Sequence, residues 1–435
     1  GFDDLLIGNA AGSKASLYLN NGHALSKSSK PAIANDSLYE DNGAHFFDID
    51  GDNDQDLYIA SGLTAKKLCK NQEDRLYINE NGIYKRADKN IPFNDLIATS
   101  AVSNDYDGDG DMDLFVGNLA KPGNYGVPVK SFILNNDGKG HFSIDNSVEL
   151  VSMVNNAVWS DINDDGFDDL LVATDWDTPK VFLNFKGELK EVEIPEGTSG
   201  LWQTISTFDM DLDGDLDIVL GNWGLNTKFS LNEGPLKMYQ NDFDKDGKEE
   251  VIVAYAIDGE FYPFNSRDEL NSQMQAMAKR IVTYKDFALK TVEEVIGSDI
   301  LKESLEFEAQ QLASGYLENN NGKFTRFVPL ADDFQLAPIN SLTKIQVDDV
   351  DYLLVSGNSF KVNTYHGGYT SLKGLFLKSK DEYKPVSDLG IEPFFDQVKG
   401  TASISMKDHN LLVVLINGGK AETYSYQNKP KSNKQ

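Results

Sequence analysis

Five short stretches of this chain repeat one arrangement: acidic or amide side chains at alternate positions, a turn residue, and then an apolar run. They span residues 48–56, 105–113, 161–169, 209–217 and 242–250. Position 6 of each stretch is Gly, except for Asn53 in the first, and both residue types enter left-handed backbone conformations readily. Because carboxylates this close together repel one another without a counter-ion, the pattern predicts five cation-binding loops.

The expected ligands of each loop are hard oxygen atoms, which Ca²⁺ prefers. They are the side chains at positions 1, 3, 5 and 9 and the backbone carbonyl at position 7, together with water. In that order of positions (1, 3, 5, 7 and 9), the first two loops supply Asp48, Asp50, Asp52, Asp54 and Asp56, and Asp105, Asp107, Asp109, Asp111 and Asp113. The third and fourth supply Asp161, Asn163, Asp165, Phe167 and Asp169, and Asp209, Asp211, Asp213, Asp215 and Asp217. The fifth supplies Asp242, Asp244, Asp246, Lys248 and Glu250, where Glu replaces the usual Asp. A set of solvated turns is the alternative, but the shared register favours about five Ca²⁺ sites.

The second half of each loop differs from an EF-hand, which requires a bidentate Glu at position 12 and flanking helices. Here position 12 is apolar and lies within a run typical of a buried strand. The residues at position 12 are Ile59, Val116, Val172, Leu220 and Val253. Each loop therefore joins two strands.

The loops recur with a period near fifty residues, and each repeat has room for several strands, which is typical of propeller blades. We predict an all-β fold, a β-propeller of four-stranded antiparallel blades. Asp4 fits position 9 of a loop one period before the first. The count gives eight modules, or seven blades if the first and last modules share one.

Residues 1–435 are expected to form a single propeller domain. Residues 1–30 are predicted to form a truncated first blade. They start at position 6 of a loop, which predicts that the chain is a piece of a longer one. Residues 398–427 are predicted to supply the closing strands. Residues 266–305 have helical spacing after a capping box at Ser266 and Glu269, which predicts two or three helices inserted in the sixth blade. The segment around Asp351 lacks alternating ligands, so no metal is predicted there.

The net charge of the chain limits the classes of partner that it is expected to bind. The chain has 40 Lys and Arg against 69 Asp and Glu, a net charge of −29. Phosphate binding needs concentrated basic residues, so nucleic acid is disfavoured. Cys69 is the one cysteine, which excludes an intrachain disulfide, and no apolar run is long enough to span a membrane.

Because weak calcium loops fill where Ca²⁺ is near millimolar, we expect an extracellular or outer-membrane-surface location.

The loops and the strands after them resemble a known family. Asp56-Leu-Tyr-Ile, Asp113-Leu-Phe-Val-Gly-Asn and Asp217-Ile-Val-Leu-Gly-Asn are similar to FG-GAP/VCBS repeats, the blades of integrin α-chain propellers. Lys121-Pro-Gly-Asn-Tyr and Gly221-Asn-Trp-Gly-Leu-Asn resemble one bacterial group, the C-terminal propellers of large surface proteins related to the UnbV/ASPIC and cartilage-acidic-protein group. This resemblance covers nearly the whole chain and implies a secreted or outer-membrane-anchored binding protein.

The residues outside the loops give little sign of catalysis. None of the five histidines lies in a recognisable metal or nucleophile motif. We therefore predict a calcium-stabilised, non-catalytic binding or scaffold module. A polysaccharide-acting hydrolase or lyase is the alternative, because paired carboxylates are abundant.

A candidate ligand face lies opposite the cation loops, in the loops that follow the second strands. Its aromatic and polar residues suit stacking on a sugar ring or anchoring a protein partner. The candidates are Tyr125, Trp176, Trp223, Tyr365 and His366. The alternative is that these side chains fill gaps between blades. We expect a glycan or protein partner on this face.

Overall fold

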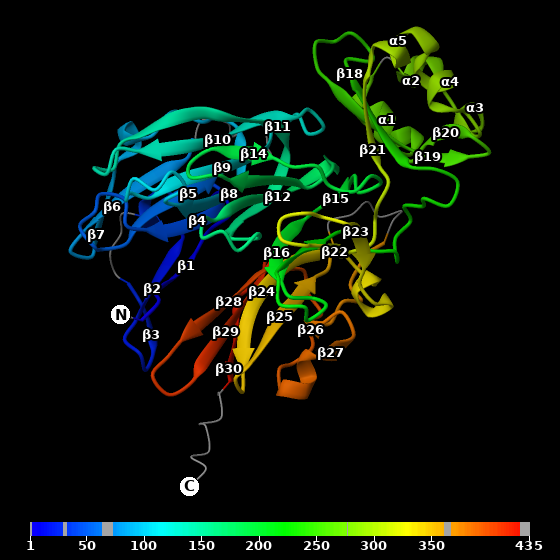
Figure 1. Cartoon of the computed structure of the whole chain (residues 1–435). Helices are drawn as coiled ribbons and strands as arrows, with labels where there is room; N and C mark the ends of the chain where they lie inside the picture. The colour runs from blue at the N-terminus through cyan, green and yellow to red at the C-terminus, as the bar shows by residue number, and fades with distance from the viewer. Residues whose placement is uncertain (1, 29–32, 63–72, 276, 361–366, 427–435) are drawn as a thin grey trace.

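The structure is a computed structural model that describes residues 2–28, 33–62, 73–275, 277–360 and 367–426. Its strands form antiparallel sheets that follow one another along the chain (Figure 1). The prediction of an all-β fold rich in four-stranded antiparallel sheets is confirmed. None of the helices within the described residues is long and apolar enough to cross a lipid bilayer.

Seven sheets form a series from the N-terminus to the C-terminus, and we call them the serial sheets. The first contains β1 (Leu5–Ile7), β2 (Ser16–Asn20) and β3 (Leu25–Lys27). The second contains β4 (Asp41–Phe47), β5 (Asp56–Ser61), β6 (Arg75–Glu80) and β7 (Ile83–Arg86). The third contains β8 (Ile97–Asn104), β9 (Asp113–Ala120), β10 (Val129–Asn136) and the first part of β11 (Phe142–Ser160). The rest of β11 begins the fourth, with β12 (Asp169–Asp177), β13 (Lys180–Asn184), β14 (Leu189–Glu191) and the short β15 (Gly200–Leu201).

The last three serial sheets complete the order. The fifth contains β16 (Thr204–Phe208), β17 (Asp217–Gly221), β22 (Gly315–Glu318) and β23 (Arg326–Pro329). The sixth contains β24 (Ile339–Val347), β25 (Val350–Gly357), β26 (Leu375–Ser379) and β27 (Glu382–Pro385). The seventh contains β28 (Val398–Ser405), β29 (Asn410–Ile416) and β30 (Glu422–Tyr426). Short 3-10 turns lie at Ile33–Asn35, Asp88–Asn90, Asp332–Gln335 and Val386–Leu389.

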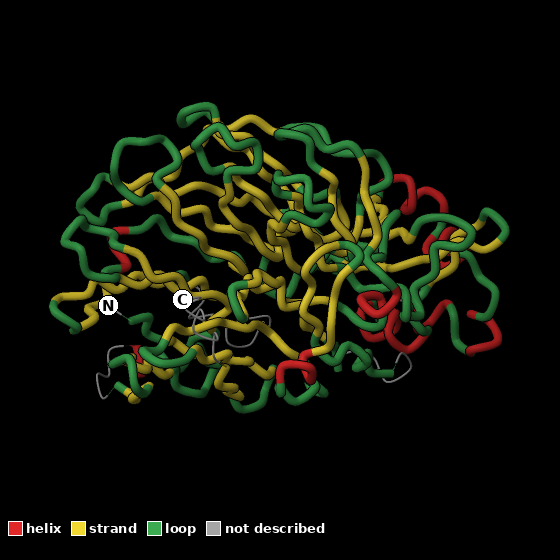
Figure 2. Tube along the Cα trace, turned by 60° about the horizontal axis from the view of Figure 1, so that its bottom comes forward, coloured by secondary structure: helices red, strands yellow, loops and turns green. Residues whose placement is uncertain are grey.

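An eighth sheet is nested inside the fifth, because it is formed by residues between β17 and β22. This nested sheet has the order β20 (Glu260–Pro263), β19 (Glu250–Ile257), β18 (Leu236–Asn241) and β21 (Leu305–Ala309). Five short helices separate β20 from β21: α1 (Arg267–Gln273), α2 (Met277–Arg280), α3 (Tyr284–Phe287), α4 (Val292–Ile296) and α5 (Ser298–Glu303). The nested part stands at the upper right of Figure 1, and most helical segments lie at one end of the molecule in Figure 2.

The helical segment starts as the sequence predicts. The Ser266 hydroxyl accepts a hydrogen bond from the Glu269 N–H, and the Glu269 carboxylate accepts one from the Ser266 N–H, which completes the capping box. Met274, Met277 and Ile281 lie in a buried cluster with residues of β18 and β19. The segment is divided into more helices than the two or three expected, because Thr283 and Thr291 open two further capping boxes.

Apolar clusters fill the spaces between neighbouring sheets. Every residue of the second strands β5 and β17 is buried, which suits the apolar runs in their sequences. The first and last serial sheets also contact one another. Leu5 and Leu25 pack against the cluster that contains Ile404, and the Lys407 N–H donates to the Gly22 carbonyl over 2.8 Å.

The turn between β24 and β25 shows why the sixth sheet differs from those with cation loops. Asp348 and Asp349 form a two-residue hairpin turn, with φ of 53° and 62°. This conformation is the favoured one for a two-residue connection between antiparallel strands. The segment around Asp351 therefore has no nine-residue loop.

Candidate metal centres

Four of the five predicted loops bring carboxylate oxygens together. In each, at least three acidic residues have one oxygen apiece within 4.8 Å of one another. The groups are Asp48, Asp50 and Asp56; Asp105, Asp107 and Asp109; Asp209, Asp211 and Asp217; and Asp242, Asp244, Asp246 and Glu250. Each group could hold a metal ion, and each comes from a single loop between the first and second strands of its sheet.

Backbone N–H groups fix the loop conformation. The Asp48 carboxylate accepts hydrogen bonds from the Gly51 and Asn53 N–H groups, over 2.9 and 3.0 Å. Asn53 has a φ of 67°, in the left-handed region expected for position 6. In the third loop Asp161 accepts from the Asp165 and Gly166 N–H groups, although its position 3 is an amide and not a carboxylate. The motif therefore gives one turn geometry in loops with different ligand sets.

The position-9 carboxylates are buried and have a structural role that the ligand spacing did not predict. Asp169 accepts from the Ile162 N–H over 3.0 Å and from the Asn184 N–H over 2.7 Å. Asp56 and Asp217 form the same two bonds, to the N–H at position 2 of the loop and to an Asn N–H at the end of the third strand. The position-9 Asp thus closes its loop through the N–H at position 2 and attaches the loop to the third strand through the Asn N–H.

Burial changes the acidity of these carboxyl groups. Loss of hydration raises the pKa of Asp56, Asp169 and Asp217 to about 6, with a smaller contribution from the other carboxylates of each loop. The same causes raise the pKa of Asp113 to about 7. Since burial disfavours the charged form, a cation bound in the loop would stabilise these groups as carboxylates.

Several loop oxygens are buried without a hydrogen-bond donor among the described residues. They are Asp50 Oδ1, Asp54 Oδ1, Asp105 Oδ1, Asp111 Oδ1, Asp113 Oδ2, Asp211 Oδ1 and Asp215 Oδ1. A buried carboxylate oxygen without a partner is costly, and a bound cation would supply that partner. The donor set consists of oxygens alone, which is the chemistry of a hard cation, so these residues fit a calcium ion.

The position-7 side chains are a feature that sequence reasoning missed. Only the backbone carbonyl was expected to act there, yet Asp54, Asp111 and Asp215 each place a buried side-chain oxygen at the loop. Burial, followed by the nearby carboxylates of Asp109, Asp107 and Asp105, raises the pKa of Asp111 to about 6. The signal was present in the sequence, because position 7 is Asp in these three loops and Phe or Lys in the other two.

Neighbouring loops lie close together at one end of the series. Asp48 and Gly51 of the first loop and Asp109 and Asp111 of the second line one hollow of about 320 Å³. Loops separated by a whole repeat in the sequence therefore share a surface.

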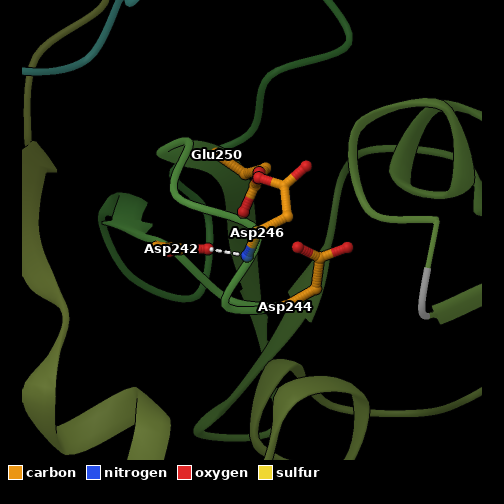
Figure 3. A group of neighbouring side chains, drawn as sticks. All are labelled: Asp242, Asp244, Asp246 and Glu250. Atoms are coloured by element: carbon orange, nitrogen blue, oxygen red, sulfur yellow. Dashed lines mark hydrogen bonds between the residues drawn. The ribbon is translucent and has the colours of Figure 1, made fainter.

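The fifth loop lies in the nested sheet and is built differently (Figure 3). Glu250 replaces Asp at position 9, and its Oε2 accepts from the Phe243 N–H over 3.0 Å. Burial, followed by the nearby carboxylates, raises the pKa of Glu250 to about 7. Lys248 at position 7 forms an ion pair with Asp246, a predicted ligand at position 5. A cation in this loop must therefore compete with the Lys248 ammonium.

The candidate ligand-face residues have different environments. Trp176 is 6% exposed and packs with Met153, Leu201 and Leu236, at the junction between the fourth sheet and the nested sheet. Its main chain has a φ of 57°, which is rare for so large a residue. For Trp176 the structure therefore supports gap filling over direct contact with a ligand.

Tyr125 covers this junction from the outside. Its side chain is 43% exposed, while its hydroxyl donates to Asp175 Oδ2 over 2.7 Å and accepts from Trp176 Nε1 over 3.2 Å. Burial raises the pKa of Asp175 to about 6, and hydrogen bonds from Tyr125 and neighbouring amides oppose this rise. Trp176 therefore helps to position an exposed aromatic side chain.

Trp223 is half-buried in an aromatic cluster. Its ring meets Phe229 and Tyr369 edge-to-face, with centroids 5.5 and 5.7 Å apart. The remaining two candidates, Tyr365 and His366, lie outside the described residues. The predicted face is thus built largely of packed aromatics, with Tyr125 as its exposed member among the described candidates.

Comparison with known proteins agrees with the repeat pattern. Residues 105–172 and 161–220 match the model of the FG-GAP-like repeat, and these ranges contain the second, third and fourth loops. The FG-GAP resemblance is therefore confirmed for this part of the chain, whereas the resemblance to the UnbV/ASPIC group stays a prediction. No curated protein matches the chain.

Among solved structures, two crystal structures of BBS1N in complex with ARL6DN match, one soaked with lead and one with mercury. Each has 10% sequence identity and a TM-score of 0.34. The alignments cover 95% of this chain and 97% or 98% of the other. A likeness this distant adds no argument about function.

Proposed function

We propose that this chain is a calcium-stabilised, non-catalytic binding or scaffold module. FG-GAP-like repeats favour a binding or scaffold role. The observation that carries the calcium proposal is the set of buried loop oxygens without hydrogen-bond donors, which recurs at equivalent positions of three serial sheets. Ca²⁺ accepts such all-oxygen, carboxylate-rich sites, and several waters can complete its coordination.

Calcium also supports a proposal about location. Loops of this kind lack the bidentate Glu of an EF-hand, so they are expected to bind Ca²⁺ weakly and to fill where it is abundant. We therefore propose that the chain acts at the bacterial cell surface or outside the cell.

The partner surface is proposed to lie at the end of the sheets opposite the cation loops. Large apolar side chains are exposed in the segments that connect strands there. Phe93 precedes β8, Phe360 follows β25 and Phe395 precedes β28, with exposures of 76%, 48% and 62%. Together with Tyr125 they offer aromatic faces to a glycan or a protein partner.

The calcium part can be tested by counting ions. Native mass spectrometry in millimolar Ca²⁺ should detect about five Ca²⁺ per chain, and little Zn²⁺ should bind, because no thiolate or imidazole lies in the loops. Fewer than about three bound Ca²⁺ ions would contradict the five-loop assignment.

The proposed partner surface can be tested by screening the chain against glycan and protein libraries and then measuring the binding of matched variants. Tyr125→Ala should weaken binding of a partner found in the screen by about thirtyfold, the effect of losing an aromatic anchor. Phe185→Ala is the control: Phe185 is 47% exposed but lies in the β13–β14 turn, on the cation-loop side. Equal effects of the two substitutions would argue against the proposed face. If the parent chain turned over a polysaccharide and the Asp175→Asn variant did not, the non-catalytic assignment would be contradicted.

A further inference from the structure

The peptide group at position 2 is hydrogen-bonded through both its N–H and its carbonyl in the first, third and fourth loops, and through its carbonyl in the second. On its N–H side it binds the position-9 carboxylate of its own loop, as Ile49 does with Asp56 and Ile162 with Asp169. On its carbonyl side it accepts a bond from a residue of the following serial sheet. A single backbone unit therefore contacts both its own loop and the next sheet.

Three asparagines supply the carbonyl-side bonds. Asn136 Nδ2 donates to the Ile49 carbonyl over 2.8 Å. Asn184 Nδ2 donates to the Tyr106 carbonyl over 2.8 Å. Asn319 Nδ2 donates to the Ile162 carbonyl over 2.7 Å. Each donor lies in or just after the third strand of its sheet, and each acceptor lies in the cation loop of the preceding sheet.

The same asparagines are attached to their own loops. The Asn136 N–H donates to Asp113, the Asn184 N–H to Asp169 and the Asn319 N–H to Asp217, over 2.7 to 2.9 Å. Each asparagine therefore bonds through its main chain to the position-9 ligand of one loop and through its side chain to the preceding loop. The bonds link the first loop to the second, the second to the third, and the third to the fourth.

These links are shielded from water. All three asparagines are buried, as are the position-9 carboxylates that they contact. A buried hydrogen bond cannot be replaced by water when one partner moves, so displacement of a loop disturbs its neighbour. The nested loop lacks this arrangement: among the described residues, no side-chain amide donates to the Phe243 carbonyl at its position 2.

We propose that Asn136, Asn184 and Asn319 couple cation binding at successive serial loops, so that these four loops fill cooperatively while the nested loop fills independently. This inference rests on the calcium binding proposed above. An ion that orders one loop fixes the position-2 peptide and, through the asparagine, the position-9 carboxylate of the next loop. Because coupling between binding sites is reciprocal, the second loop favours the third as much as the third favours the second.

An isosteric substitution separates this role from a local structural one. Asn184 Oδ1 accepts from the Gly187 N–H over 2.8 Å, and this bond holds the turn after β13. Asn184→Asp keeps that acceptor and removes the Nδ2 donor to two carbonyls, that of Tyr106 in the preceding loop and that of Asp168 in its own sheet. Asn79→Asp is the matched control: Asn79 accepts from Gly82 in the same way, but its Nδ2 donates to the Gln55 carbonyl of its own sheet.

The coupling is measured most directly in a protein that retains two serial loops. Asp48→Ala, Asp209→Ala and Asp242→Ala would disable the first, fourth and fifth loops of the full chain. Native mass spectrometry over a Ca²⁺ titration then gives the populations with zero, one and two ions, and hence the ratio of the second to the first stepwise binding constant. Asn184→Asp should lower this ratio about fivefold, the value of one net hydrogen bond, whereas Asn79→Asp should leave it unchanged.

A purely structural role would weaken both binding constants alike and leave their ratio intact, which would overturn the coupling. If the triple variant does not fold, Asp161→Ala in the otherwise intact chain gives the same comparison. Loss of the third site should weaken Ca²⁺ binding at the remaining serial loops about fivefold when Asn184 is present. The weakening should be smaller in the Asn184→Asp background. Ca²⁺ binding at the nested loop should not change. If the remaining ions bind independently of one another, the coupling between loops is overturned but the calcium proposal stands. If the parent chain binds no Ca²⁺, both the coupling and the calcium proposal are overturned.

Discussion

The four serial loops and the nested loop carry the same motif in different surroundings. In each serial loop an Asp at position 9 is buried and receives the N–H of an asparagine on the third strand. In the nested loop Glu250 takes that place, and Lys248 competes for a predicted ligand. The serial loops lie between sheets that pack on one another, whereas the nested sheet completes its own core with helices.

This difference shows that a ligand pattern defines a local turn but not its connections. The same alternation of acids produces the same N–H bonds to position 1 in the first, third and fifth loops. Attachment to a neighbouring sheet requires an asparagine far away in sequence, such as Asn319, which lies after the whole nested part. Five predictions test this contrast, in order of decreasing effect.

Removal of calcium should have the largest effect. Each site that is saturated at about 100 times its dissociation constant adds about 2.7 kcal/mol to the free energy of unfolding. Calorimetry with and without a chelator should therefore show a large fall in the melting temperature of the serial sheets. Melting curves that coincide in the two conditions would mean that the loops are solvated turns.

Trp176→Ala should loosen the junction between the two regions. Trp176 is buried against residues of the fourth sheet and the nested sheet, so its removal should cost about 3 kcal/mol through lost packing and a cavity. Limited proteolysis should then cut within residues 222–314 more rapidly, while Ca²⁺ binding by the serial loops persists. Phe93→Ala, at a 76% exposed side chain, is the control and should change neither property. Loss of serial calcium sites in Trp176→Ala would show that the two regions fold as one unit.

Removal of the position-9 side chain should distinguish the loops. Asp169→Ala leaves the buried N–H groups of Ile162 and Asn184 without acceptors, at a cost of about 1–3 kcal/mol for each in the free energy of unfolding. Glu250→Ala removes the acceptor of one such N–H, that of Phe243. Urea denaturation of the metal-free variants should show the larger loss for Asp169→Ala. Equal losses would contradict the different roles of the two carboxylates.

The pH dependence of stability should reverse with calcium. In the folded metal-free chain the pKa of Asp113 is raised to about 7 and that of Asp56 to about 6. A raised carboxyl pKa stabilises the fold at acidic pH, and this contribution is lost as the pH rises through the folded pKa. The melting temperature of dialysed, metal-free protein should thus fall by a few degrees between about pH 5 and about pH 8. Saturating Ca²⁺, which binds the deprotonated groups, should abolish this fall, and a fall of the same size with Ca²⁺ would count against metal binding by these acids.

Removal of the competing ammonium should have the smallest effect. The Lys248 and Asp246 side chains are 63% and 37% exposed, so water screens their ion pair and it contributes little to stability. Lys248→Ala should leave the melting temperature nearly unchanged and strengthen Ca²⁺ binding at the nested loop a few-fold in calorimetric titration. Lys245→Ala, at another lysine of the same loop, is the control. An equal gain in both variants would indicate a general charge effect and not release of Asp246.

Much of the fold could be predicted because its signals are local. The alternation of acids, the left-handed residue at position 6 and the apolar run after each loop lie within about a dozen residues, and they specify turn and strand by backbone sterics and burial. The capping box at Ser266 is equally local. The burial of Trp176 could not be predicted in this way, since its neighbours come from β11, β15 and the nested sheet.

The sequence by itself determined the five loops, the strands that flank them, the all-oxygen donor sets and the helical segment, because each depends on residues that are close in the chain. The tertiary structure alone decided that the fifth loop stands in a nested sheet. It also decided that asparagines join one loop to the next. The physical reason is that hydrogen bonds such as Asn319 to Ile162, between residues more than a hundred positions apart, form only after sheets pack. Local sequence specifies which groups are available, and packing decides which of them meet.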